Sequence, residues 1–261
     1  GFTKIESGGS TTVAESGTTD TFTVVLDAQP ASDVVISVTS NDTTEATVSP
    51  ATLTFTSGNW NSAQTVTVTG INDDLVDGTQ TSTTTMSVVD ASSDNNFDSL
   101  ADQTVSVTTA DTDVAGFTKI ESGGSTTVAE SGTTDTFTVV LDAQPASDVV
   151  ISVTSGDTGE ATVSPATLTF TSGNWNSAQT VTVTGVNDSL IDGSQNTTIT
   201  MSVVDSISND SFDSLADQTV TAATTDNDTA GFTVTQSGGS TSVAESGTTD
   251  TFTVVLGAQP T

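Results

Sequence analysis

The sequence contains no cysteine, histidine, tyrosine or arginine, and its only basic residues are two lysines. Without cysteine, neither a disulfide nor a thiolate metal site can form. Without histidine or cysteine, Ser–His–Asp, Cys–His and His–metal catalysis are excluded as well. A functional site in this chain must therefore be built from carboxylates, amides, hydroxyls and backbone groups.

Positive charge is nearly missing, since 33 Asp and Glu face two Lys and give a formal net charge of −31. This excludes nucleic acid as a partner, because phosphate binding needs Lys and Arg, and it excludes adsorption to an anionic membrane surface. No apolar run approaches the roughly 20 residues that span a bilayer, so we expect no membrane insertion in this segment. Self-repulsion of this size destabilises a compact chain unless cations gather on it.

The chain repeats itself. Residues 1–40 recur unchanged as 116–155, and a third copy begins at Gly231. A period this long is a whole domain, too long for a solenoid unit. We expect complete domains at 1–115 and 116–230, whose partners are the neighbouring repeats, and the first strands of a third, incomplete domain at 231–261. No segment can complete that third domain, so we expect the chain to be a window cut from a longer array.

Apolar residues alternate with polar ones, as in Phe22, Val24 and Leu26 between threonines. A period of two indicates half-buried strands, and Thr and Val suit a pleated surface. In the first repeat we predict strands at 11–14, 20–27, 34–40, 47–55, 64–71, 80–90 and 103–109. About seven short strands per repeat predict an all-β fold of tandem immunoglobulin-like, Greek-key β-sandwiches.

The acidic residues fall in loops that should meet. If successive strands run in opposite directions, the loops after the first, third and fifth strands and after the last strand lie at one end of the sandwich. This inference needs every strand to be single, and 47–55 is the irregular stretch where it is weakest. The loops carry eight carboxylates, namely Glu15, Asp42, Glu45, Asp73, Asp74, Asp77, Asp111 and Asp113. Most recur one period later as Glu130, Asp157, Glu160, Asp188, Asp192, Asp226 and Asp228.

Carboxylates gathered in this way cannot all stay ionised and unpaired. Calcium fits an all-oxygen set better than magnesium, which wants a small octahedral site, or zinc, which wants His or Cys. The alternative is that the loops are merely solvated and keep a secreted protein soluble. We predict Ca²⁺, with candidate ligands Glu15, Asp42, Asp73, Asp74, Asp77, Asp111, Asp113, Glu130, Asp157, Asp188, Asp192, Asp226 and Asp228. Ser189 stands where Asp74 stood, so the second site should be weaker or hold one ion fewer.

Several short motifs resemble the Calx-β domain, whose close bacterial relatives occur in tandem in large surface proteins. They are VAESG at 13–17, TFTVVL at 21–26, TVTVTGINDDLVDG at 65–78 and DTD at 111–113. The resemblance covers the whole repeat and implies a calcium-binding β-sandwich with its ions at one pole, near the junction with the next domain. It implies ligands at Glu15, Asp73, Asp74, Asp77, Asp111 and Asp113.

The loop sequences are nearly the same in the two repeats. A surface that recognises a partner needs particular side chains, so this similarity favours a role in spacing over a role in recognition. We therefore predict a non-catalytic, calcium-rigidified extender, stalk or filament-forming region of a secreted or surface-attached, adhesin-like protein, in which other copies of the chain are possible partners. The alternative is an adhesive module that binds carbohydrate or protein. Trp60 lies in a loop and could plug the sandwich core, contact the preceding domain or stack on a sugar.

Overall fold

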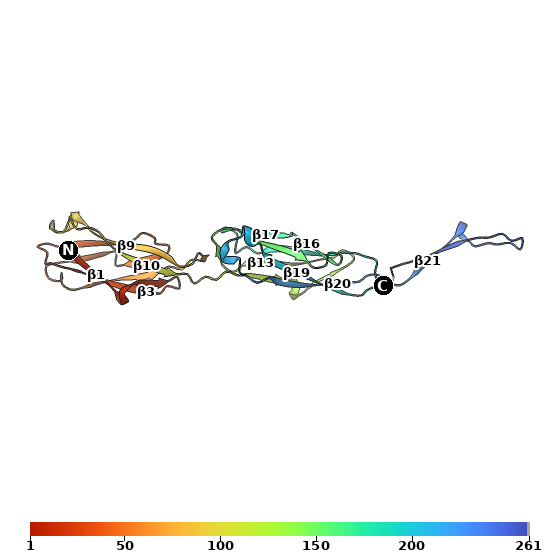
Figure 1. Ribbon diagram of the computed structural model, residues 1–261, viewed down its shortest axis with the longest axis horizontal. Coiled ribbons are helices and arrows are strands. Elements are labelled where there is room, and N and C mark those ends of the chain that lie inside the picture. Colours follow the sequence, from red (N-terminus) through yellow and green to blue (C-terminus); the bar gives the residue numbers. More distant parts are fainter. Residues whose placement is uncertain (260–261) are drawn as a thin grey trace. The chain divides into compact units, whose positions relative to one another are not determined.

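The computed structural model describes residues 1–259. The chain divides into two compact units, one from Gly1 to Val114 and one that begins at Ala115. The first unit is repeat 1, and the second holds repeat 2 together with strands of the third copy. Each complete repeat is a β-sandwich of two facing sheets (Figure 1). The predicted all-β sandwich fold is therefore confirmed.

Repeat 1 is built from a four-stranded and a five-stranded sheet. The four-stranded sheet is antiparallel throughout and has the order β1-β3-β7-β5, with β1 at Phe2–Glu6, β3 at Thr19–Leu26, β7 at Gln64–Gly70 and β5 at Ala46–Ser49. The five-stranded sheet has the order β2-β10-β9-β4-β6, with β2 at Thr11–Ala14, β10 at Gln103–Ala110, β9 at Gln80–Val88, β4 at Val34–Ser40 and β6 at Thr52–Phe55. In this sheet β2 runs parallel to β10, and the other pairs are antiparallel. The remaining elements are β8 (Leu75–Val76) and the 3₁₀ turns η1 (Ser7–Gly9) and η2 (Asp90–Ser92).

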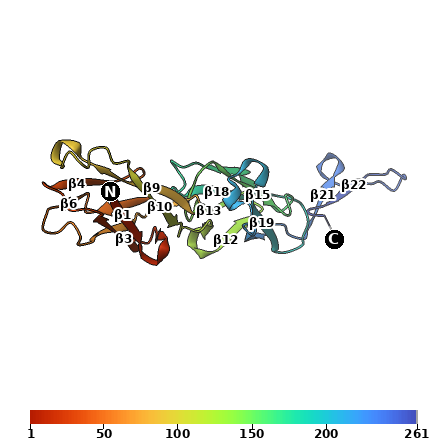
Figure 2. The same ribbon diagram turned by 60° about the vertical axis from the view of Figure 1, so that its left-hand side comes forward.

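Repeat 2 has the same architecture (Figure 2). One sheet has the order β11-β13-β18-β16 (Phe117–Glu121, Thr134–Leu141, Gln179–Gly185, Ala161–Ser164), and the other has the order β12-β20-β19-β15-β17 (Thr126–Ala129, Gln218–Thr225, Gln195–Val203, Val149–Ser155, Thr167–Phe170). Short elements are β14 (Gln144–Pro145), η3 (Ser122–Gly124), η4 (Asp205–Ile207) and η5 (Asp210–Phe212). Every main strand has a counterpart in repeat 1, as near-identical sequences require.

One predicted strand is divided between the sheets, and one main strand was not predicted. The predicted strand 47–55 is two strands, β5 in the four-stranded sheet and β6 in the five-stranded sheet, with Pro50 and Ala51 between them. The strand predicted at 11–14 is β2, but the chain first forms β1 in the opposite sheet. Alternation tells which residues face inward and cannot tell which sheet a strand joins, because both sheets face one core. β1 and β2 follow one another without a hairpin reversal, and so do β5 and β6. The inferred meeting of the acidic loops therefore survives both corrections.

The core lies between the two sheets and consists of the alternating residues found in the sequence. Phe22, Val24 and Val66 from one sheet and Ile36 and Met86 from the other are completely buried. Trp60 is half-buried, packs against this core, and its carbonyl accepts a hydrogen bond of 3.2 Å from the amide of Leu26. Among the three interpretations of this side chain, the core plug is the one its packing supports.

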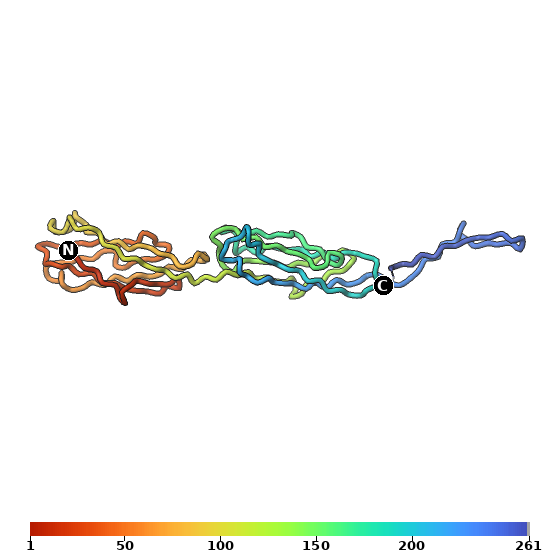
Figure 3. Tube along the Cα trace, viewed as in Figure 1, coloured from red at the N-terminus to blue at the C-terminus, as the bar shows by residue number. Residues whose placement is uncertain are grey.

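The third copy contributes a hairpin of β21 (Phe232–Gln236) and β22 (Phe252–Leu256), with the turn η6 (Ser237–Gly239) between them (Figure 3). Phe232 is 68% exposed, whereas Phe2 at the same place in repeat 1 is 4% exposed. The hairpin has the register of β1 with β3 but not the strands that bury these residues in a complete repeat. Among residues 1–259, none of the short 3₁₀ turns is long and apolar enough to cross a membrane.

Candidate metal site

Four segments of repeat 1 meet at one end of the sandwich, which we call the acidic pole. They are Glu15, the segment 42–45, the segment 72–78 and the segment 111–113. Backbone hydrogen bonds join them: the amide of Glu15 donates to the carbonyl of Ala110 (3.1 Å), and the amide of Ile71 donates to the carbonyl of Glu45 (2.9 Å). The corresponding segments of repeat 2 are joined by the same bonds, to Thr225 and Glu160.

Glycine permits two features of this end. A Cβ on Gly70, the last residue of β7, would collide with the backbone of Ala14 at the end of β2, so glycine lets the two strand ends approach closely. Gly78 has φ of +73°, a left-handed conformation that favours glycine, and its amide donates to Asp111 Oδ2 at 2.7 Å. The backbone thus bends the loop after β7 toward the segment after β10.

The carboxylates at the acidic pole form two groups that share one residue. Glu15, Glu45 and Asp73 each offer an oxygen within 4.8 Å of the others, and so do Glu15, Asp111 and Asp113. In repeat 2 the groups are Glu130, Asp226 and Asp228, and Glu160, Asp188 and Asp192.

Several of these oxygens are buried without a partner. Glu45 is only 9% exposed, and its Oε2 accepts no hydrogen bond within residues 1–259. Asp77 Oδ1 and Asp113 Oδ2 are likewise buried and accept no hydrogen bond in the part of the chain that the structure describes. Within residues 1–259 the equivalent atoms of repeat 2 are also buried without a hydrogen-bond partner, namely Glu160 Oε2, Asp192 Oδ1 and Asp228 Oδ2. A buried polar group without a partner is costly, more so when it is charged, so these oxygens are compatible with a bound cation.

Burial and mutual repulsion also alter the acidities. Burial first, and then the charges of Asp111, Asp73 and Glu45, raise the pKa of Glu15 to about 7 against a lowering hydrogen bond from the amide of Thr112. Burial, followed by neighbouring carboxylates, likewise raises the pKa of Glu45 and of Asp113. In repeat 2 the pKa values of Glu130 and Glu160 are raised for the same reason, with burial first. Without a cation, the folded protein therefore holds these groups at a cost that grows as pH rises toward 7.

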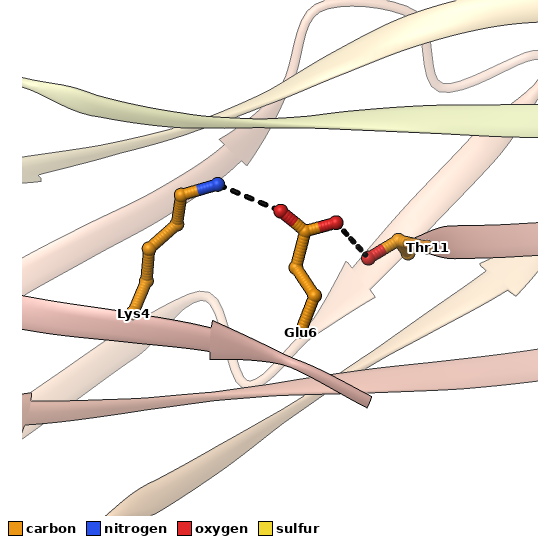
Figure 4. Close-up of polar contacts among 3 residues, drawn as sticks. All are labelled: Lys4, Glu6 and Thr11. Atoms are coloured by element: carbon orange, nitrogen blue, oxygen red, sulfur yellow. Dashed lines mark hydrogen bonds and ion pairs between the residues drawn. The ribbon is translucent and has the colours of Figure 1, made fainter. Parts of the chain in front are cut away.

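The two lysines form ion pairs with glutamates outside the carboxylate groups. Lys4 Nζ lies 2.8 Å from Glu6 Oε1, and Thr11 Oγ1 donates to Glu6 Oε2 at 3.3 Å (Figure 4). Lys119 makes the same pair with Glu121 at 3.0 Å. Since the sequence has no other Lys or Arg, no side-chain cation remains to neutralise the acidic poles.

The donor set fits a hard cation of calcium's size. A Ca²⁺ ion about 2.4 Å from each ligand oxygen holds oxygens up to about 4.8 Å apart, twice the bond length. The oxygens within each carboxylate group lie no farther apart than this limit. Three carboxylates leave room for carbonyl oxygens and water in a shell of six to eight oxygens. The residues present therefore fit calcium, and Glu15 could bridge two ions in repeat 1.

Most of the candidate ligands chosen from the sequence belong to these groups, but the segment 42–45 contributes a different residue. The candidates within the groups are Glu15, Asp73, Asp111, Asp113, Glu130, Asp188, Asp192, Asp226 and Asp228. Asp77 lies at the pole, and Asp74 is exposed beside it. Asp42 instead caps its own turn, since its Oδ1 accepts from the amide of Thr44 at 3.0 Å, and Asp157 accepts from the amide of Gly159 at 2.9 Å. Glu45 and Glu160, absent from the candidate list, join the groups in their place.

Only half of this exchange has a signal in the sequence. Asp42 follows Asn41 in an exposed turn, where a short carboxylate bonds its own backbone. Glu45 directly precedes Ala46, the buried first residue of β5, but that position does not predict burial, because Asp33 directly precedes the buried Val34 and is exposed. Metal ligation by any of these residues stays a prediction.

No family model matches the chain, and no curated protein matches it. Solved structures resemble it only distantly. CBD12 from CALX1.2 is 14% identical over 77% of this chain and 78% of that one, with a TM-score of 0.29. Domains 4 and 5 of the S-layer protein SbsC are 21% identical over 73% and 76%, with a TM-score of 0.32. SSP-19 of Caenorhabditis elegans, an MSP-domain protein like family member, is 17% identical over 40% and 94%, with a TM-score of 0.27. Sequence identities and TM-scores this low do not assign the chain to a family.

Proposed function

We propose that this chain is a non-catalytic structural array from an extracellular surface protein, and that each complete repeat binds calcium at its acidic pole. The observation that carries the proposal is the set of buried, unpartnered carboxylate oxygens within residues 1–259, gathered from segments far apart in the sequence and repeated at the same positions in both repeats. Solvated acidic loops would keep such oxygens in water. The Calx-β-like motifs at 13–17 and 65–78 support the same proposal.

Bound calcium would supply the positive charge that the sequence lacks. Glu15, Glu45 and Asp73 would hold one ion, and Asp111 and Asp113 would join Glu15 around another. A ligand that binds only the folded state stabilises it by about 2.7 kcal/mol per site at a hundredfold excess over its Kd. Relief of repulsion among the carboxylates adds to this effect at low salt.

The ion would also restrain the connection to the next repeat. Asp111 and Asp113 directly precede the short segment that leads to Gly116. Holding their carboxylates restricts that segment, which suits an extender, a stalk or a filament-forming region better than a single recognition site. A carbohydrate-binding role has less support, because the side chain of Trp60 packs against the core.

Thermal melting tests calcium binding. We expect EGTA at low ionic strength to lower the melting temperature by several degrees or more relative to millimolar calcium, because the carboxylates then repel one another without an ion. Magnesium at equal concentration should restore little of the loss, since it needs a smaller octahedral site. An unchanged melt in EGTA would mean that the poles are solvated loops.

Glu15→Gln makes the test specific. At pH 8 the variant should lose much of the stabilisation by calcium in repeat 1, yet in EGTA it should be no less stable than the original chain, because one buried negative charge is gone. Asp102→Asn is the matched control: Asp102 is exposed just before the eight-residue strand β10, at the end opposite Asp111, and about 30 Å from it at 3.3 Å per residue. Equal loss of stability in calcium and in EGTA would assign Glu15 a purely structural role.

A further inference from the structure

Two differences between the acidic poles of the repeats bear on the proposed sites. Asp74 is replaced by Ser189 in the loop after the strand β7 or β18, and Thr112 is replaced by Asn227 in the closing segment. The carboxylates of the groups themselves are kept as the pairs Glu15/Glu130, Glu45/Glu160, Asp73/Asp188, Asp77/Asp192, Asp111/Asp226 and Asp113/Asp228. The two substitutions therefore change the surroundings of otherwise equivalent ligand sets.

Asp74 gives repeat 1 one more negative charge at this place than repeat 2. It is exposed, and it lies close enough to Asp113 to raise the pKa of that carboxyl, after burial and the charge of Asp111. Ser189 carries no charge. Affinity for calcium rises with the number of negative charges around the ion.

Asn227 gives repeat 2 a hydrogen bond between two segments of the acidic pole that needs no cation. Its Nδ2 donates to Asn187 Oδ1 at 3.1 Å, and this bond joins the closing segment to the loop that carries Asp188. In both repeats the two segments are also joined by a carboxylate: Asp111 Oδ2 accepts from the amides of Asp77 (3.2 Å) and Gly78 (2.7 Å), and Asp226 Oδ2 accepts from the amide of Gly193 (2.9 Å). Thr112 has no side-chain amide to add a bond like that of Asn227. Repeat 1 thus has only the carboxylate link at this place, whereas repeat 2 has the same link and a neutral side-chain bond as well.

Burial of the ligands points the same way. Glu45 is nine-tenths buried with an unpartnered Oε2 within the described part of the chain, while Glu160 is less buried. The two groups of repeat 1 share Glu15, but those of repeat 2 have no residue in common among residues 1–259. Repeat 1 therefore has one more charge beside its ligands and buries one of them, Glu45, more deeply than repeat 2 buries Glu160.

We propose that the two repeats are calcium sites of different strength, with Asp74 and Thr112 making repeat 1 the tighter and more calcium-dependent one, and Ser189 and Asn227 making repeat 2 weaker and partly ordered without the ion. This rests on the proposed calcium-binding function. As calcium falls, repeat 2 releases its ions first with little loss of order, and repeat 1 releases them later with a larger loss. The two nearly identical domains then respond over a broader range of calcium concentration than two sites of equal affinity could.

Hydrogen exchange followed by mass spectrometry on the whole chain separates the two poles, because residues 71–79 (INDDLVDGT) and 186–194 (VNDSLIDGS) differ in mass. Protection is followed against free calcium, and its midpoint does not depend on intrinsic exchange rates. We expect the midpoint for 71–79 at a concentration roughly tenfold lower than that for 186–194, from one added charge at the site. In EGTA the first segment should lose the larger share of its protection.

Reciprocal exchanges assign the difference to these residues. Asp74→Ser with Thr112→Asn should move the midpoint of 71–79 to that of 186–194, and Ser189→Asp with Asn227→Thr should move the second midpoint to the first. Asp102→Ser removes a charge at the far end of the sandwich and should move neither. Coincident midpoints in the original chain, or midpoints that the exchanges leave in place, overturn the proposal while calcium binding stands. Absence of calcium-dependent protection in both segments overturns the proposed function itself.

Discussion

At the scale of single residues, repeat 1 carries buried hydroxyl groups that repeat 2 partly removes. Ser82, Thr84 and Thr109 are buried, and within the described residues their hydroxyl oxygens have no partner. In repeat 2 the counterpart of Thr84 is Ile199, which is completely buried. Both side chains occupy the same register, opposite Val105 and Val220 on the neighbouring strand. The second repeat thus shows that this core position accepts an apolar side chain.

We therefore predict that Thr84→Val stabilises repeat 1 by about 1 kcal/mol, because valine has the shape of threonine without the unpaired hydroxyl. Ile199→Thr is the reciprocal change and should destabilise repeat 2, since it buries a new hydroxyl and removes a methyl group. Denaturant unfolding of the chain and its variants, at constant calcium, measures both changes. A less stable Thr84→Val variant would show that the hydroxyl has a partner such as an internal water.

At the scale of elements, a carboxylate fastens the loop between β9 and β10 to the loop between β3 and β4. Asp94 Oδ2 accepts from the amides of Ala31 (2.7 Å) and Ser32 (3.1 Å), and Oδ1 accepts from the amide of Asn96 (3.0 Å). These donors, with Asn96 first, hold the pKa of Asp94 below its usual value. In repeat 2 the neutral Asn209 stands here, and its Nδ2 donates to Ser147 Oγ at 3.2 Å.

Because the folded pKa of Asp94 is lowered, its contribution is fully present above the ordinary pKa of 3.8 and is lost as pH falls through the folded value. We predict that Asp94→Asn lowers the melting temperature of repeat 1 at pH 6 and that this difference closes as the pH approaches 2. Melting curves from pH 2 to 7 provide the measurement. The reverse change, Asn209→Asp, should add such a pH-dependent component to repeat 2, and a difference in either variant that is constant with pH would contradict the role of charge.

At the scale of the whole molecule, 33 acidic residues against two lysines leave a net charge of −31. Repulsion of this kind is screened within about 10 Å at 0.1 M salt and within about 3 Å at 1 M. General screening and specific calcium binding therefore have different dependences on salt. A bound ion would add to the hydrogen bonds that join Asp111 to Asp77 and Gly78, and high salt would not remove its effect as it removes the effect of general screening by calcium.

Small-angle scattering of the chain should distinguish the two effects. We predict a narrower distribution of interatomic distances in calcium than in EGTA, because the segment after Asp113 is restrained once the carboxylates are ligands. The difference should persist at 1 M sodium chloride if the ion is bound, and it should vanish there if calcium only screens. Identical curves in calcium and EGTA at both salt concentrations would leave calcium without influence on the connection between repeats.

Much of this organisation is decided locally and can be read from the sequence. The repeats are visible as identity between 1–40 and 116–155, and the inward residues are visible as alternation, since a strand places successive side chains on opposite faces. The gathering of acidic loops follows from strand direction alone. The strands at 11–14 and 34–40 even have the predicted bounds.

Only the tertiary structure decided which oxygens meet. The division of 47–55 between two sheets, the choice of Glu45 over Asp42, and the packing of Trp60 against the core all depend on paths that the chain takes between strands. Alternation is the same for either sheet, because both sheets face one core. A loop carboxylate can bond its own turn or turn inward at similar local cost, and the surrounding strand ends settle that choice.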